Sequence, residues 1–148
     1  MQHHEERVGS KGQHCQVPSW DTIKDTVDYD FGTKKDFSYK GLSMREVSDH
    51  VAKFASGIWQ IHPFPEGNTR ATAVFIIKYL NSLGYKVNNE PFANHSWYFR
   101  NALVRANYNN LPKGVIADSR FLEAFFGNML LSESNELKNR FIHLEWVD

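Results

Sequence analysis

Residues 43–84 read SMREVSDHVAKFASGIWQIHPFPEGNTRATAVFIIKYLNSLG, and their pattern predicts two helices joined by a short loop. The first helix is expected to begin after Ser43, because Ser43 and Glu46 have the spacing of a capping box. Apolar residues then recur every three or four positions and predict one buried face. They are Val47, Val51, Phe54, Ile58 and Ile61. We expect this helix to end near His62, because Pro63 disfavours helical geometry in the residue before it.

The second helix of this stretch is predicted to begin at Asn68 or Thr69, since either residue can act as an N-cap, and to end at Gly84. Its apolar side chains cover most of its circumference, as in the run VFII at residues 74–77. A helix that is apolar nearly all round is typical of the buried centre of a domain.

Three more helices are predicted outside this stretch. One begins at Ser19 and is followed by a connector over residues 30–42, which contains two glycines and several charges. Another spans residues 93–108, and the last begins with Asp118 as its cap and carries apolar residues to position 130. No long alternating strand pattern occurs. The predicted fold class is therefore mostly α, a helical bundle with one short N-terminal β-hairpin.

Composition excludes several classes of protein. The 148 residues suffice for one domain, and 17 basic side chains balance 17 acidic ones. This balance favours neither nucleic acid nor a membrane as a partner. Cys15 is the only cysteine, and the first residues contain no apolar signal segment. We therefore expect a cytoplasmic protein.

The loop from His62 to Arg70, HPFPEGNTR, combines residue types that suit chemistry on a phosphate. Gly67 permits close approach of the backbone, and the unpaired N–H groups of the following helix attract an anion. Arg70 adds a forked cation, and Glu66 is placed to hold a divalent metal. His62 can serve as a base, while Phe64 is expected to anchor the loop in the core. The same residues also fit a surface loop with a structural histidine.

This nine-residue loop resembles the signature of the Fic (filamentation induced by cAMP) family, His-Pro-Phe-x-Asp/Glu-Gly-Asn-x-Arg, and meets every defined position. Flanking segments resemble a bacterial subgroup with the sequence HPFxEGNTR. They are IWQI at residues 58–61, NALVRANY at residues 101–108 and LKNR at residues 137–140. The resemblance covers residues 7–143 and implies a Fic-fold helical bundle, with residues 1–6 as a frayed terminus and 144–148 as a tail.

The resemblance implies a protein adenylyltransferase, which transfers AMP from ATP to a hydroxyl side chain of a target protein. His62 would be the general base, and Glu66 would ligate Mg²⁺ on the phosphates. Arg70 would hold the β-phosphate of the leaving pyrophosphate. The residues expected to bind ATP are Gly67, Asn68, Thr69, Arg70, Tyr98 and Asn101, of which the last two would face the base. Trp97, on the same helix, is expected to pack in the core.

The resemblance also implies protein partners. Residues 10–12, Ser-Lys-Gly, resemble part of the family's flap, a hairpin that aligns the target as an extended segment. If residues 10–12 belong to the flap, the given sequence starts just before it and does not include the helices that usually precede it in the family. We therefore interpret the domain as an N-terminally shortened core. A regulatory or antitoxin partner would be compatible with it.

Two departures from the family pattern bear on function. Thr69 stands where a second glycine is frequent, and Ala73 replaces an arginine that normally helps to hold the γ-phosphate or pairs with an inhibitory glutamate. Ser132 and Glu136 have the spacing of the family's inhibitory helix, which would place them on one helix face. Leu137 departs from the Gly or Asn of that motif, so we favour a solvated Glu136 and expect no working internal inhibitor. Alternative functions are removal of AMP, transfer of another nucleotide or phosphoryl group, or a non-catalytic interaction module.

Overall fold

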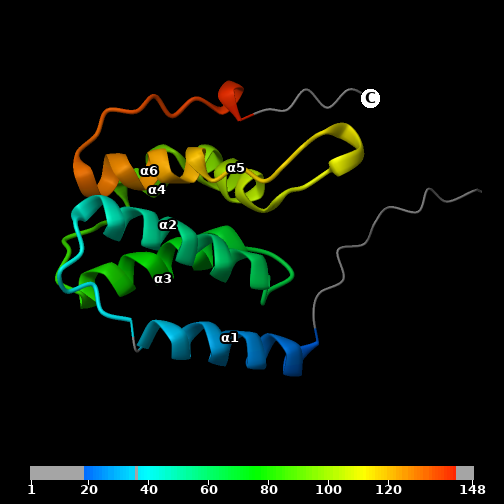
Figure 1. The fold of residues 1–148 in the computed structure, drawn as a ribbon, viewed down its shortest axis with the longest axis horizontal. Coiled ribbons are helices and arrows are strands. Elements are labelled where there is room, and N and C mark those ends of the chain that lie inside the picture. Colours follow the sequence, from blue (N-terminus) through cyan, green and yellow to red (C-terminus); the bar gives the residue numbers. More distant parts are fainter. Residues whose placement is uncertain (1–18, 36, 143–148) are drawn as a thin grey trace, which may run out of the picture.

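The structure, a computed structural model, describes residues 19–35 and 37–142. These residues form a mostly helical fold, as predicted (Figure 1). The α-helices are α1 (Trp20–Lys35), α2 (Met44–Ile61), α3 (Asn68–Ser82), α4 (Glu90–Asn94), α5 (Ser96–Asn107) and α6 (Arg120–Leu131). Two 3₁₀ turns, η1 (Leu111–Lys113) and η2 (Asn139–Phe141), complete the described elements.

Helix α2 is the centre of the fold. It packs against α1, α3, α5 and α6, and Figure 1 shows α1 on one side of the α2–α3 pair and α4 to α6 on the other. The core contains Val51 and Ala55 of α2, Ile76 of α3, Phe99 of α5 and Phe126 of α6, all fully buried. The apolar face predicted for α2 is therefore the face around which the other helices assemble.

The ends of α2 and α3 are set by local hydrogen bonds. The Ser43 hydroxyl accepts the Glu46 N–H, and the Glu46 carboxylate accepts the Ser43 N–H at 2.8 Å, which confirms the capping box. These bonds to Ser43 lower the pKa of the Glu46 carboxyl. Helix α3 ends at Ser82. Gly84, just beyond the C-cap Leu83, has a φ of 90° that suits glycine, and the Tyr85 N–H donates to the Leu80 carbonyl. The predicted start of α2 is correct, and α3 ends two residues before the predicted Gly84.

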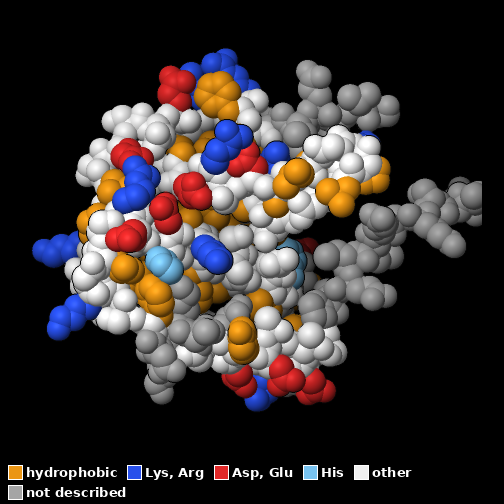
Figure 2. Space-filling view, viewed as in Figure 1, with side chains coloured by type: hydrophobic (Ala, Val, Ile, Leu, Met, Phe, Trp, Pro, Cys, Tyr) orange, Lys and Arg blue, Asp and Glu red, His pale blue; other side chains and the backbone are white. Residues whose placement is uncertain are grey.

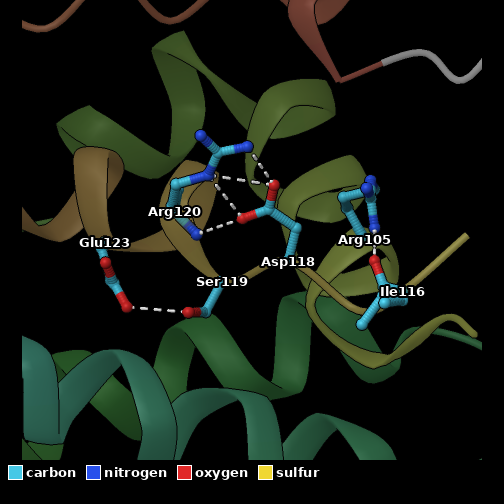
Figure 3. Close-up of polar contacts among 6 residues, drawn as sticks. All are labelled: Arg105, Ile116, Asp118, Ser119, Arg120 and Glu123. Carbon is cyan, nitrogen blue, oxygen red and sulfur yellow. Dashed lines mark hydrogen bonds and ion pairs between the residues drawn. The ribbon is translucent and has the colours of Figure 1, made fainter.

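The start of α6 depends on Asp118, although the N-cap is Ser119 (Figure 3). One Asp118 carboxylate oxygen accepts the Arg120 backbone N–H at 3.0 Å, and the carboxylate pairs with the Arg120 guanidinium. This pairing lowers the pKa of the Asp118 carboxyl. The Asp118 N–H donates to the Arg105 carbonyl, so the same residue joins the first turn of α6 to the end of α5.

Several predicted helix details are wrong. The helix expected over residues 93–108 is two helices, because α4 begins earlier with Pro91 in its first turn and α5 starts afresh after His95. Helix α1 continues through part of the expected connector. Helix α3 is not buried all round, since Val74 is half exposed. Trp97 is 68% exposed and does not pack in the core.

The segment after α6 is also different from the prediction. Helix α6 ends at Leu131, and Ser132 adopts a left-handed conformation with φ 54°. The chain then turns back, so that the Glu133 N–H approaches the Gly127 carbonyl and the Glu133 carboxylate pairs with Arg45. Ser132 and Glu136 therefore do not share a helix face.

The predicted N-terminal β-hairpin, including residues 10–12, lies outside the described residues. Within residues 19–35 and 37–142 the backbone forms no named strand, only an isolated antiparallel bridge between Asn110 and Val115. In the same part of the chain no helix combines the length and apolarity needed to cross a bilayer. Figure 2 shows acidic and basic side chains mixed over one face, in keeping with their equal numbers.

Candidate active site

The loop that joins α2 to α3 lies at one end of the bundle (Figure 1). It begins with His62, the C-cap of α2, in a left-handed backbone conformation with φ 50° and ψ 56°. A left-handed conformation costs a residue with a side chain roughly 1–2 kcal/mol, and such strain is common at functional positions. His62 and Ser132 are the non-glycine residues with positive φ among those described.

The His62 imidazole is oriented by Trp59. Its Nδ1 lies 2.9 Å from the Trp59 carbonyl oxygen, which can only accept a hydrogen bond. In the neutral ring Nδ1 must therefore carry the proton, and Nε2 keeps a free lone pair. The ring also contacts the Trp59 indole edge to face, with 4.7 Å between centroids. This tautomer suits His62 to accept a proton at Nε2.

The turn into α3 has features that suit an anion, and they surround Gly67. Gly67, rather than Asn68 or Thr69, is the N-cap, with φ 79°. The first backbone N–H groups of α3 have no partner within the helix and point out of its N-terminus. The Arg70 guanidinium folds back over the same turn, 3.4 Å from the position that a Gly67 side chain would occupy. Backbone donors and a cation thus converge on the start of α3.

Asn68 closes the loop on itself. Its amide oxygen accepts the Phe64 N–H at 3.0 Å, and its amide nitrogen donates to the Phe64 carbonyl at 2.7 Å. Asn68 is only 7% exposed, so its side chain shapes the loop. Phe64 itself is 51% exposed, and the prediction that it anchors the loop in the core is wrong. The two hydrogen bonds of the Asn68 side chain therefore hold the loop, in place of the buried Phe64 ring that was expected to do so.

Glu66 is exposed at the tip of the loop. Among the described residues no group of three His, Cys, Asp or Glu side chains could hold a metal alone. Mg²⁺ in nucleotide sites is commonly bound by one or two carboxylates together with phosphate oxygens and water. A single carboxylate beside an anion site fits that arrangement, and Glu66 would be its protein ligand.

Comparison with known families places this loop in context. The model of the Fic/DOC family matches residues 4–80, just over half of the chain, and includes the whole loop from His62 to Arg70. The chain belongs to the Fic/DOC family. No curated protein and no solved structure matched it. The match to the Fic/DOC model ends within α3, so α4 to α6 lie outside the matched segment.

An apolar cavity of about 300 Å³ adjoins the Fic/DOC loop. Thr69, Arg70 and Ala73 of α3 form one wall, and Phe92 and Phe99 belong to the opposite wall from α4 and α5. The small side chain of Ala73 faces this space, where the family often has an arginine. The sequence did not identify Phe92 and Phe99 as cavity-lining residues, because an aromatic residue in a cavity wall has the same sequence pattern as one in the core.

Tyr98 and Asn101 do not line this cavity. Tyr98 is 3% exposed, and its hydroxyl donates to the Phe121 carbonyl at 3.0 Å. Burial raises the pKa of this phenol to about 12. The amide of Asn101 is partly buried and donates to the Asn139 side chain at 3.1 Å. The Tyr98 ring therefore belongs to the core rather than to this cavity, and Asn101 links α5 to η2.

Proposed function

We propose that this Fic/DOC protein is a protein adenylyltransferase that transfers AMP from ATP to a hydroxyl group of a target protein. The observation that carries the proposal is the His62 ring, whose Nδ1 is bound to the Trp59 carbonyl and whose Nε2 is left to face a reactant, on the same short loop as the candidate anion site. The two features suit the two reactants, since one removes a proton from a hydroxyl and the other binds the phosphates.

The reaction is an in-line displacement at the α-phosphorus of ATP. His62 Nε2 takes the hydroxyl proton as the hydroxyl oxygen forms a bond to that phosphorus. The bond from the phosphorus to the pyrophosphate oxygen breaks, which leaves a phosphodiester-linked AMP on the target and releases pyrophosphate. Arg70 and the N–H groups of α3 would stabilise the charge that develops on the phosphates.

Glu66 would hold Mg²⁺, which when bound supplies charge neutralisation on the phosphates. The cavity beside Arg70 would receive the nucleoside, because Phe92 and Phe99 in one of its walls suit a flat base. With Ala73 in that wall, the family's second arginine is missing from the γ-phosphate site.

The position of the label decides the reaction. Incubation with ATP labelled at the α-phosphorus is expected to label protein, whereas ATP labelled at the γ-phosphorus is not. Label from the γ-position alone would establish phosphate transfer instead.

His62→Ala tests the proposed base. We expect a loss of transfer of ~10²–10⁴-fold with the fold retained, which circular dichroism would check. His95→Ala is the matched control, because His95 is exposed between α4 and α5 and does not line the cavity. Near-normal transfer by His62→Ala would refute the mechanism.

Glu66→Ala tests the proposed metal ligand. Activity and the apparent affinity for Mg²⁺ are both expected to fall, as measured by titration of transfer against Mg²⁺. An active variant with an unchanged titration would show that the metal binds elsewhere.

A further inference from the structure

Trp59 contacts both sides of the loop. Its carbonyl accepts the His62 backbone N–H at 3.2 Å and the His62 Nδ1 at 2.9 Å. Its indole ring contacts the imidazole, and the indole Nε1–H donates to the Thr69 hydroxyl at 3.1 Å. One partly buried residue at the end of α2 thus touches the base directly and is bound to the first turn of α3.

The bond to Thr69 restrains how the indole can move. An indole has a single donor, so this bond fixes the rotation of a rigid, two-ring side chain about its own axis. The face that the indole presents to His62 is then fixed as well. Because the bond is partly buried, few water molecules can replace either partner, and its loss leaves a donor or an acceptor unsatisfied.

We infer that Trp59 is a positioning residue, which orients the His62 ring through its hydrogen bond to Thr69. The inference deepens the proposed function and rests on it for its effect on catalysis. Without the bond the indole turns, and the imidazole samples orientations in which Nδ1 leaves the Trp59 carbonyl. The anion site retains Arg70 and its backbone donors, so ATP binding suffers less than the rate of transfer.

Nitrogen-15 NMR of the His62 ring tests the inference without any enzymatic assay. We expect the neutral wild-type ring to be protonated at Nδ1. Trp59→Phe and Thr69→Val, which each remove one partner of the bond, are expected to shift the His62 signals in the same direction. Thr69→Val also serves if Trp59→Phe folds poorly. Trp97→Phe is the matched control, because that exposed tryptophan lies on α5.

A wild-type ring protonated at Nε2 would overturn the inference, as would unchanged His62 signals in both variants. Neither result depends on whether the protein transfers AMP, so failure of the proposed function leaves this test intact.

Kinetics give the second readout. Each single variant is expected to lower kcat by about three- to tenfold, with a smaller change in KM for ATP. The double variant Trp59→Phe/Thr69→Val should lose little more than either single variant, because both remove the same bond. Thr69→Ser keeps the hydroxyl and should preserve the coupling to Trp59. Independent, multiplicative losses in the double variant would refute a role through this bond.

Discussion

Replacing His62 by glycine and by alanine gives two variants that both lack the imidazole and differ in backbone freedom. Both lose the bond from Nδ1 to the Trp59 carbonyl and the contact with the Trp59 ring. The difference in their stability therefore measures the strain at this position. We expect His62→Gly to be more stable than His62→Ala.

The magnitude follows from the backbone angles. At φ 50° and ψ 56° a residue with a Cβ atom pays roughly 1–2 kcal/mol that glycine does not. Glycine also gives the unfolded chain more freedom, which offsets about 0.4–1 kcal/mol of that gain. The mid-points of the two ranges give an expected net difference of about 0.8 kcal/mol in favour of glycine.

Urea unfolding of the two variants, followed by circular dichroism, measures this difference. Lys53 supplies the control, since it is exposed in the interior of α2. There the order should reverse, with Lys53→Gly about 1 kcal/mol less stable than Lys53→Ala. If His62→Ala equals or exceeds His62→Gly in stability, the left-handed conformation is not strained and the reasoning fails.

Three further predictions concern other parts of the chain. Ser48→Ala should raise the free energy of unfolding by about 1 kcal/mol, because Ser48 Oγ is buried with no hydrogen-bond partner among the described residues; a clear loss in urea unfolding would contradict this. The Tyr98 phenol has a pKa raised from 10.0 to about 12, so the stability it contributes is complete below pH 10 and is lost as the pH rises to 12. The stability of Tyr98→Phe should thus depend less steeply on pH in that range, and equal slopes would count against it. Glu136→Gly should raise self-labelling with ATP by less than about tenfold, since Glu136 lies beyond α6 and pairs with Lys138 at 3.0 Å; a larger rise would make Glu136 inhibitory.

The parts of the fold that the sequence predicts well are those with local causes. The capping box at Ser43 and the glycine turn that follows α3 at Gly84 depend on residues within one helical turn, and the structure contains both. The early start of α4 also had a local signal, because Pro91 and the preceding Glu90 are typical of a first helical turn. The split of the predicted helix over residues 93–108 could therefore have been found.

Other features depend on tertiary packing and could not be read from the sequence. Trp97, Tyr98 and Phe99 are three consecutive aromatic residues, and the buried face of α5 includes the last two and excludes Trp97. The packing of α5 against α2, α4 and α6 determines that choice. The end of α6 at Ser132 could not be predicted either, because a serine in a left-handed conformation has no strong sequence signal. The turn that follows is held by the ion pair between Glu133 and Arg45, which are 88 positions apart.

The candidate site likewise has some features with local causes and others that depend on tertiary packing. The motif pointed to His62, Glu66, Gly67 and Arg70, whose proposed roles follow from residue type and order along the loop. It did not predict that Asn68 would bind Phe64 or that Trp59 would reach Thr69, because both depend on how the two helices meet.

The loop is held by hydrogen bonds between near neighbours in sequence, and this has a consequence for the order of folding. Trp59 and Thr69 are ten positions apart, and Phe64 and Asn68 are four apart. Contacts of such short range close small loops at little entropic cost, whereas the core must wait for α5 and α6. During synthesis the N-terminal portion of a chain folds first. The hairpin of α2 and α3 can therefore shape the loop from His62 to Arg70 on the ribosome before α5 and α6, which carry Phe99 and Phe126, have emerged.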